Sequence, residues 1–120
     1  MRIVGSLFQG TRELVAADKV SSGALARFPD ARWFHDYRVM FEQMADQIDA
    51  VVVSVPDFMH YAIGLAALRY KKHLYMEKPL CRCITEVRAL RAAAASAGVV
   101  TQMGNQGRTA EGIRLAREWV

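Results

Sequence analysis

The sequence has little cysteine and lacks any long hydrophobic run. Its 120 residues include two cysteines, Cys81 and Cys83, which are too close together for a probable disulfide. Further ligands at suitable spacing are missing nearby, so we expect no metal site. The longest apolar run, around residues 50–55, has the length of a strand and is too short to span a membrane. We expect the first residues to form no signal peptide, and we expect a cytoplasmic protein.

The charge pattern argues against a nucleic-acid-binding protein. The net charge is +4, with 23% charged and 52% hydrophobic residues, as in an ordinary soluble domain. The basic residues are scattered and form no stripe interleaved with aromatic residues, so we expect no nucleic-acid partner. The positive balance favours a small anionic ligand such as a pyrophosphate. The length suffices for one domain with a core of its own.

Short apolar runs alternate with helical patterns along the chain. We expect strands at residues 2–7, 33–34, 49–55, 73–76 and 99–103. We expect helices over residues 11–20, after a cap at Asp36, over 58–70, over 85–97 before Gly98, and after a cap at Thr109. This alternation predicts parallel βαβ units and a doubly wound α/β sheet. Ligands of such sheets bind beyond the carboxyl ends of the strands.

Three segments that follow expected strands carry candidate functional residues. Lys78 could donate a hydrogen bond to a reacting hydroxyl, and the alternative is a surface lysine paired with a neighbouring acid. Pro56 turns the chain, so that a flat ring could lie against it, while Asp57 reads as a helix cap and His60 as either a site residue or a satisfied helix-end histidine. Asn105 lies between Gly104 and Gly107, which suits close approach to a ligand or a plain turn.

Taken in order, these segments resemble the glucose-fructose oxidoreductase, inositol dehydrogenase and rhizopine-catabolism (Gfo/Idh/MocA) family. The resemblance extends over about residues 30–120. It rests on the strand at 49–53, the spacing from Pro56 to His60, residues 72–80 with their Glu-Lys-Pro sequence, and residues 101–107.

The resemblance implies a cofactor, a substrate class and a set of site residues. Members of the family bind NAD or NADP in a Rossmann domain and oxidise or reduce a hydroxyl carbon, usually of a sugar or cyclitol. By position, Lys78 is the implied catalytic residue beside the nicotinamide. The implied cofactor-binding residues are Ser54, Val55, Pro56, His60, Glu77, Lys78, Pro79 and Asn105.

The sequence also departs from the family pattern at both ends. We find no Gly-x-Gly-x-x-Gly turn, since Gly5 and Gly10 are too far apart. Residues 2–7 align better with the second strand of the family, which ends here near Gln9 rather than at an acid. We therefore expect residues 1–120 to form a partial NAD(P)-binding Rossmann-like domain, with the first strand, the glycine-rich turn and the C-terminal substrate domain absent.

These departures leave two functions open for the chain. The first is an NAD(P)-dependent oxidoreductase acting on a sugar, polyol or related hydroxyl compound, present as a part too short to be active alone. The second is a non-catalytic relic that binds a nucleotide weakly or associates with a partner. An exposed sheet edge would also allow homo-oligomers. A flavodoxin-like signalling domain is disfavoured, because residues 7–10 supply no acids.

Overall fold

A four-stranded parallel sheet forms the centre of the protein. The computed structural model describes residues 3–4, 32 and 34–119. The strands lie side by side in chain order as β1 (Ile3–Val4), β2 (Ala50–Val53), β3 (His73–Met76) and β4 (Thr101–Met103). The strand expected at 73–76 has the predicted bounds, and those expected at 49–55 and 99–103 are confirmed with shorter bounds. With its crossing helices, the sheet is an α/β, Rossmann-like fold.

The position of β1 in the sheet is given by its pairing with β2. Ile3 pairs with Ala50 and Val4 with Val51, so β1 lies directly beside β2. In a doubly wound sheet of order 3-2-1-4-5-6, the strand beside the fourth is the first strand. β1 therefore lies beside β2 as the first strand of such a sheet lies beside the fourth, and the expected alignment of residues 2–7 with the family's second strand stays a prediction. That alignment rests on distance along the chain, which does not fix pairing. Residues 5–31, with the expected helix at 11–20, and Trp33 lie outside the described residues.

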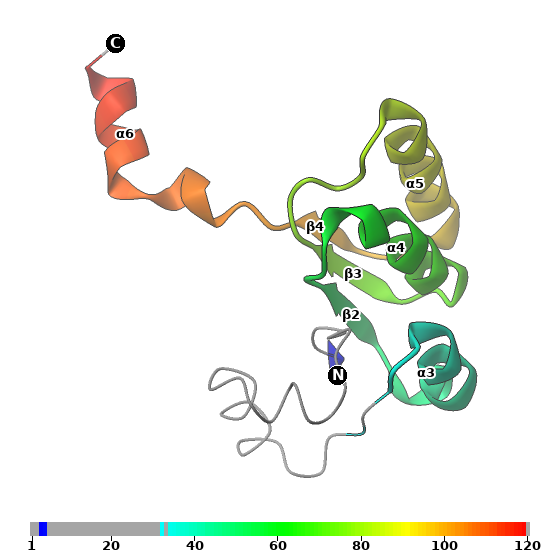
Figure 1. Cartoon of the computed structure of the whole chain (residues 1–120). Coiled ribbons are helices and arrows are strands. Elements are labelled where there is room, and N and C mark those ends of the chain that lie inside the picture. Colours follow the sequence, from blue (N-terminus) through cyan, green and yellow to red (C-terminus); the bar gives the residue numbers. More distant parts are fainter. Residues whose placement is uncertain (1–2, 5–31, 33, 120) are drawn as a thin grey trace.

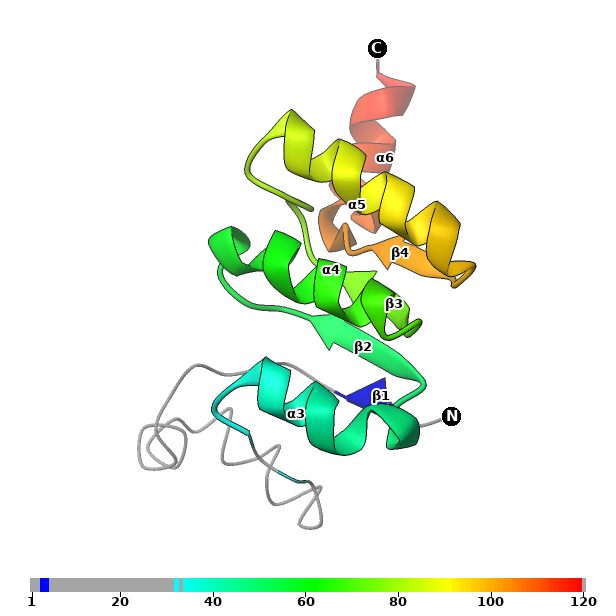
Figure 2. The same ribbon diagram turned by 90° about the vertical axis from the view of Figure 1, so that its right-hand side faces the viewer.

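Three helices lie on one side of the sheet, as Figures 1 and 2 show. They are α3 (Tyr37–Met44), α4 (His60–Arg69) and α5 (Ile84–Ala97). The predicted cap at Asp36 is confirmed, because its carboxylate accepts a hydrogen bond of 2.9 Å from the backbone N–H of Arg38. The predicted end of α5 is confirmed as well, since Gly98 has the left-handed conformation, with φ 65°, that favours glycine.

Two other predicted caps are wrong. Asp57 lies inside a short 3₁₀ turn, η2 (Asp57–Met59), and Thr109 lies inside another, η3 (Gln106–Thr109). The helices that follow, α4 and α6 (Glu111–Glu118), begin without a side-chain cap. The physical reason is that the segment before each helix first closes a tighter i→i+3 turn, which shifts the start of the helix beyond the expected residue. A third 3₁₀ turn, η1 (Ala45–Gln47), follows α3.

The core lies between the sheet and these helices. Val51 and Val53 of β2 pair in register with Leu74 and Met76 of β3, and all four side chains are buried. Alternate residues of a strand point to one face, so this set forms one apolar layer. Phe41 of α3 is fully buried and stacks on the ring of Tyr70, the residue directly after α4, at 4.9 Å between centroids.

The face of α4 that packs on the sheet is made of His60, Ile63, Gly64, Ala67 and Leu68, which are all buried. An added Cβ at Gly64 would lie 3.1 Å from Met76 Sδ, so the helix sits very close to β3 at this point. The small residue Gly64 allows this close approach.

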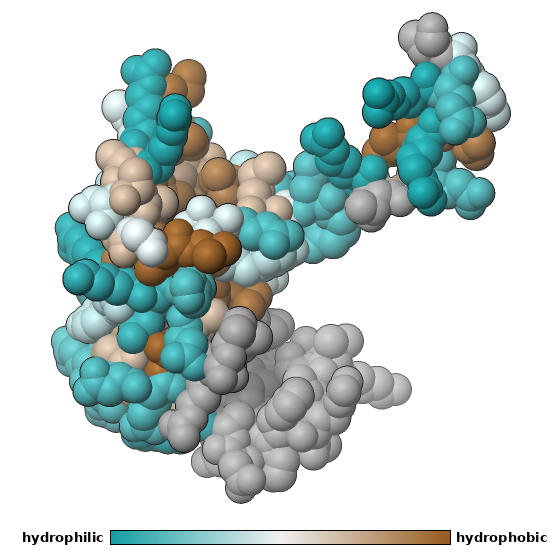
Figure 3. All heavy atoms as spheres, turned by 180° about the vertical axis from the view of Figure 1, so that it is seen from behind, coloured by the Kyte–Doolittle hydropathy of each residue, from teal (hydrophilic) through white to brown (hydrophobic). Residues whose placement is uncertain are grey.

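The last helix, α6, extends away from the sheet (Figure 1). Seen from behind, hydrophilic and hydrophobic residues both appear on it (Figure 3). Its exposed apolar side chains are Ile113 and Leu115, and Trp119 follows directly after the helix. Within the described part of the chain, no helix is both long and apolar enough to cross a membrane.

Candidate functional site at the carboxyl edge of the sheet

The loops that follow β2, β3 and β4 lie side by side at one edge of the sheet. The strands are parallel, so their carboxyl ends meet at this edge. The backbone pairing continues one residue beyond the strands: Glu77 N–H donates to Val53 C=O at 3.0 Å, and Gly104 N–H donates to Met76 C=O at 2.8 Å. The three segments singled out from the sequence therefore start from adjacent, hydrogen-bonded positions.

The side chain of His60 connects the loops that follow β2 and β3. His60 is the first residue of α4 and is 1% exposed. Its Nδ1 lies 2.6 Å from the carbonyl oxygen of Pro79, and its Nε2 lies 2.9 Å from the carbonyl oxygen of Val55. The ring is thus enclosed by the backbone of both loops. Its expected contact with a cofactor stays a prediction, and any such contact would run through the loops that it holds.

Glu77 connects the second loop to the third. Its Oε1 accepts hydrogen bonds from Tyr75 Oη, at 3.3 Å, and from Gln106 Nε2 in η3. Gly104 packs against this group so closely that an added Cβ would lie 2.6 Å from both Glu77 Oε1 and Tyr75 Oη. Partial burial, followed by the charge and hydrogen bond of Glu77, raises the pKa of Tyr75. Tyr75 therefore stays a neutral donor to Glu77 in ordinary buffers.

None of the remaining candidate residues on the three loops is buried. Ser54, Pro56, Lys78, Pro79 and Asn105 are exposed, and Val55 is half-buried. The Lys78–Pro79 peptide is cis. Among the described residues Lys78 makes no ion pair, while the neighbouring carboxylate of Glu77 accepts hydrogen bonds from Tyr75 and Gln106. The structure thus favours an available cation at this edge over the alternative of a lysine paired with the adjacent acid.

The sequence interpretation did not assign Tyr75 and Gln106 to the site. Both hold Glu77 in place, and neither is a ligand contact in itself. A signal for Tyr75 was available, since residues two apart along a strand point to the same face. Gln106 reaches Glu77 from a different loop, and sequence spacing carries no signal for such a contact.

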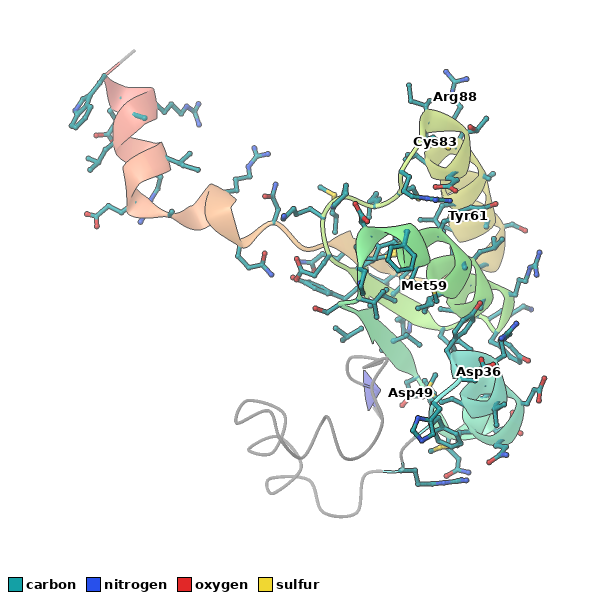
Figure 4. All side chains as sticks on the ribbon, viewed as in Figure 1. Asp36, Asp49, Met59, Tyr61, Cys83 and Arg88 are labelled. Carbon is teal, nitrogen blue, oxygen red and sulfur yellow. The ribbon has the colours of Figure 1, made fainter. Side chains whose placement is uncertain are left out.

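The two cysteines lie just before α5 and have different chemistry. Cys83 is exposed at the amino end of that helix (Figure 4), and both thiols are free. A hydrogen bond with the Thr85 hydroxyl, at 3.2 Å, together with the backbone of Glu86, lowers the pKa of Cys83. Burial, with the nearby charge of Glu86, raises the pKa of Cys81. No group of three His, Cys, Asp or Glu residues in the described chain could hold a metal ion.

We expect Cys83 to be alkylated well before Cys81. The thiolate is the reactive form, and a lower pKa places more of Cys83 in that form at any pH below the ordinary thiol range. Iodoacetamide labelling between pH 6.5 and 9, followed by peptide mass spectrometry, measures both rates. The rate at Cys83 should rise at lower pH than the rate at Cys81. A Thr85→Ala variant should move the Cys83 profile to higher pH, and an unchanged profile would contradict the role of Thr85.

The chain resembles known oxidoreductases over most of its length. Residues 8–105 match the family model GFO_IDH_MocA, described as an oxidoreductase family with an NAD-binding Rossmann fold. The chain is 38% identical over 71 residues to 1,5-anhydro-D-fructose reductase from Ensifer adhaerens, covering 59% of this chain and 21% of that protein. It is 34% identical over 73 residues to scyllo-inositol 2-dehydrogenase (NADP(+)) IolW from Bacillus subtilis, covering 61% of this chain and 20% of that protein.

Solved structures give the same result. An inositol dehydrogenase homolog from Azotobacter vinelandii, complexed with NAD+, is 41% identical, with a TM-score of 0.58, over 60% of this chain and 19% of that one. The WlbA (WbpB) dehydrogenase from Thermus thermophilus shares the fold, with a TM-score of 0.76 and 21% identity, over 98% of this chain and 45% of that one. The chain spans about a fifth of the length of the curated relatives that it matches. Since the family model covers residues 8–105, the chain belongs to the Gfo/Idh/MocA family of oxidoreductases, whose NAD-binding domain has the Rossmann fold.

Proposed function

We propose that the carboxyl edge of the sheet binds a nicotinamide dinucleotide, NAD or NADP. We propose further that the chain supplies part of the nucleotide-binding domain of an oxidoreductase acting on a sugar, polyol or related hydroxyl compound. The observation that carries the proposal is the arrangement of this edge. His60 and Glu77 connect three adjacent loops through hydrogen bonds. The same loops carry exposed polar and cyclic side chains. In α/β sheets this edge is where ligands bind.

The residues present suit the parts of a dinucleotide. Pro56 offers a flat apolar surface, which fits the face of a nicotinamide ring. Asn105 has donors and acceptors for an amide or a ribose hydroxyl. Gly104 lets the third loop approach the second at a distance that a Cβ would prevent. Lys78 brings an exposed positive charge that can donate a hydrogen bond to a substrate oxygen. The bound nicotinamide would supply the hydride chemistry, and the protein would position it.

The named relatives indicate the class of cofactor and substrate. One is complexed with NAD+, and another is named for NADP(+), so both dinucleotides are candidates for this chain. Their names refer to inositol and 1,5-anhydro-D-fructose, which are cyclic compounds with several hydroxyl groups. We infer that this chain's complete enzyme acts on a compound of the same kind.

Calorimetric titration of the folded 120-residue chain with NADH, NADPH and ADP-ribose tests the proposal. We expect NADH or NADPH to bind with a Kd in the range of about 1–100 μM, and ADP-ribose to bind more weakly because it lacks the nicotinamide that faces Pro56 and Lys78. Circular dichroism establishes that the chain is folded. A folded chain that binds none of the three would favour the non-catalytic alternative, and equal binding of ADP-ribose would contradict the assignment of these loops to the nicotinamide.

A further inference from the structure

The two partners of His60 are backbone carbonyl oxygens, and both belong to loops that the proposed function assigns to the cofactor. Carbonyl oxygens only accept hydrogen bonds, so every bond in this group requires an N–H from the ring. A neutral imidazole donates to one of the two carbonyls, and a ring with two N–H groups donates to both. Either way, the ring touches the turn after β2 and the loop after β3 at once.

The base of this link is rigid. His60 is the first residue of α4, and the helix is fixed to the core by Ile63, Gly64 and Ala67, which are all buried. Gly64 sits against Met76 at the end of β3, so the helix position is set close to the same edge. A side chain held on a packed helix places its partners more precisely than a loop residue can. The position of the packed helix α4 therefore fixes the separation of the two loops, which the loops alone would not fix.

We propose that His60 is a positioning residue, which holds the Val55–Pro56 turn and the Lys78–Pro79 loop at a fixed separation across the carboxyl edge. This inference rests on the proposed function for its effect on cofactor binding, while the link itself rests on the two contacts of the ring. Through Val55 the ring sets the place of Pro56, and through Pro79 it sets the place of Lys78. His60 touches neither cofactor nor substrate in this role, and it acts through the backbone of the two loops.

Three substitutions separate the role of hydrogen bonding from that of volume. His60→Leu fills much of the space but leaves both carbonyls without a donor. In His60→Asn the amide nitrogen lies near the place of Nδ1 and can donate to Pro79. In His60→Gln it lies near the place of Nε2 and can donate to Val55. His35→Leu is the matched control, because His35 is exposed and lies before α3, outside the candidate site.

The experiment combines NADH and NADPH titration of the full chain with amide NMR spectra. We expect His60→Leu to raise the Kd by about tenfold or more, and His60→Asn and His60→Gln to fall between it and the unmodified chain. The amide resonances of Ser54, Val55, Lys78 and Leu80, which lie on both loops, should shift together in His60→Leu, while His35→Leu should leave them and the Kd unchanged. If His60→Leu does not fold, the Asn and Gln variants carry the same comparison.

Other outcomes overturn the inference or the proposed function separately. An unchanged Kd in a folded His60→Leu variant overturns the positioning role, and so does a loss that neither Asn nor Gln reduces. If the unmodified chain binds neither dinucleotide, the proposed function fails, and the link is decided by the spectra alone. Resonance shifts on both loops then support it, and shifts confined to α4 overturn it.

Discussion

Replacing Gly104 with alanine is expected to lower the melting temperature of the chain by about 5–15 °C and to weaken dinucleotide binding. An added Cβ would lie 2.6 Å from Glu77 Oε1 and from Tyr75 Oη, well inside contact distance. The carboxylate must move away, and its hydrogen bonds from Tyr75 and Gln106 are then lost or distorted. Overpacking of this kind costs about 1–3 kcal/mol, which in a small domain corresponds to the stated shift.

The matched control is Gly107→Ala on the same loop. Nothing lies within 4 Å of an added Cβ there, and we expect a change in melting temperature within about 2 °C. A Glu77→Ala substitution should be less harmful in the Gly104→Ala background than alone, because it removes the clashing Glu77 Oε1 and Cδ and leaves only Tyr75 Oη close to the added Cβ. Thermal unfolding followed by circular dichroism measures all four variants. Equal melting temperatures for Gly104→Ala and Gly107→Ala would show that the Glu77 group does not need the glycine.

Local features of the sequence predicted most of the fold. The apolar run before Pro56 and the run from His73 to Met76 became neighbouring parallel strands, as their composition and spacing indicated. Asp36 and Gly98 were predicted correctly as helix ends because each acts on its own backbone: one accepts from an N–H two residues later, and the other has a left-handed conformation. The three candidate loops came together because parallel strands put all their carboxyl ends at one edge.

The features that sequence reasoning missed depend on contacts between distant residues. The position of β1 is set by its pairing with β2, across more than forty intervening residues. The Gln106–Glu77 hydrogen bond joins two loops, and the His60–Pro79 contact joins helix α4 to a loop. The spacing of these residues along the sequence gives no signal for either contact. Asp57 shows the limit for helix caps: its residue type suits a cap, but the turn that starts at Pro56 places the helix start beyond it.

Replacing Lys78 with alanine is expected to reduce turnover by about 10²–10⁴-fold while raising the dinucleotide Kd by less than about fivefold. Lys78 is exposed at the carboxyl edge, and among the described residues it makes no ion pair, so its ammonium group is available to a ligand. A donor that bonds to the reacting oxygen of a substrate acts mainly in the transition state, where charge on that oxygen changes. An exposed charge beside a bound dinucleotide contributes little to affinity, because solvent screens it.

The dinucleotide Kd is measured with the 120-residue chain. Turnover is measured with a chimera, in which the aligned segment of this chain replaces the corresponding segment of the 41%-identical inositol dehydrogenase homolog from Azotobacter vinelandii. Lys72→Ala is the control, because Lys72 precedes β3 and Lys78 follows it, so the same charge is removed at the opposite edge of the sheet. We expect Lys72→Ala to leave turnover within about twofold. Equal turnover in the Lys78→Ala and Lys72→Ala chimeras would remove Lys78 from the chemistry. A large loss of dinucleotide binding with turnover preserved at saturation would instead make Lys78 a cofactor contact.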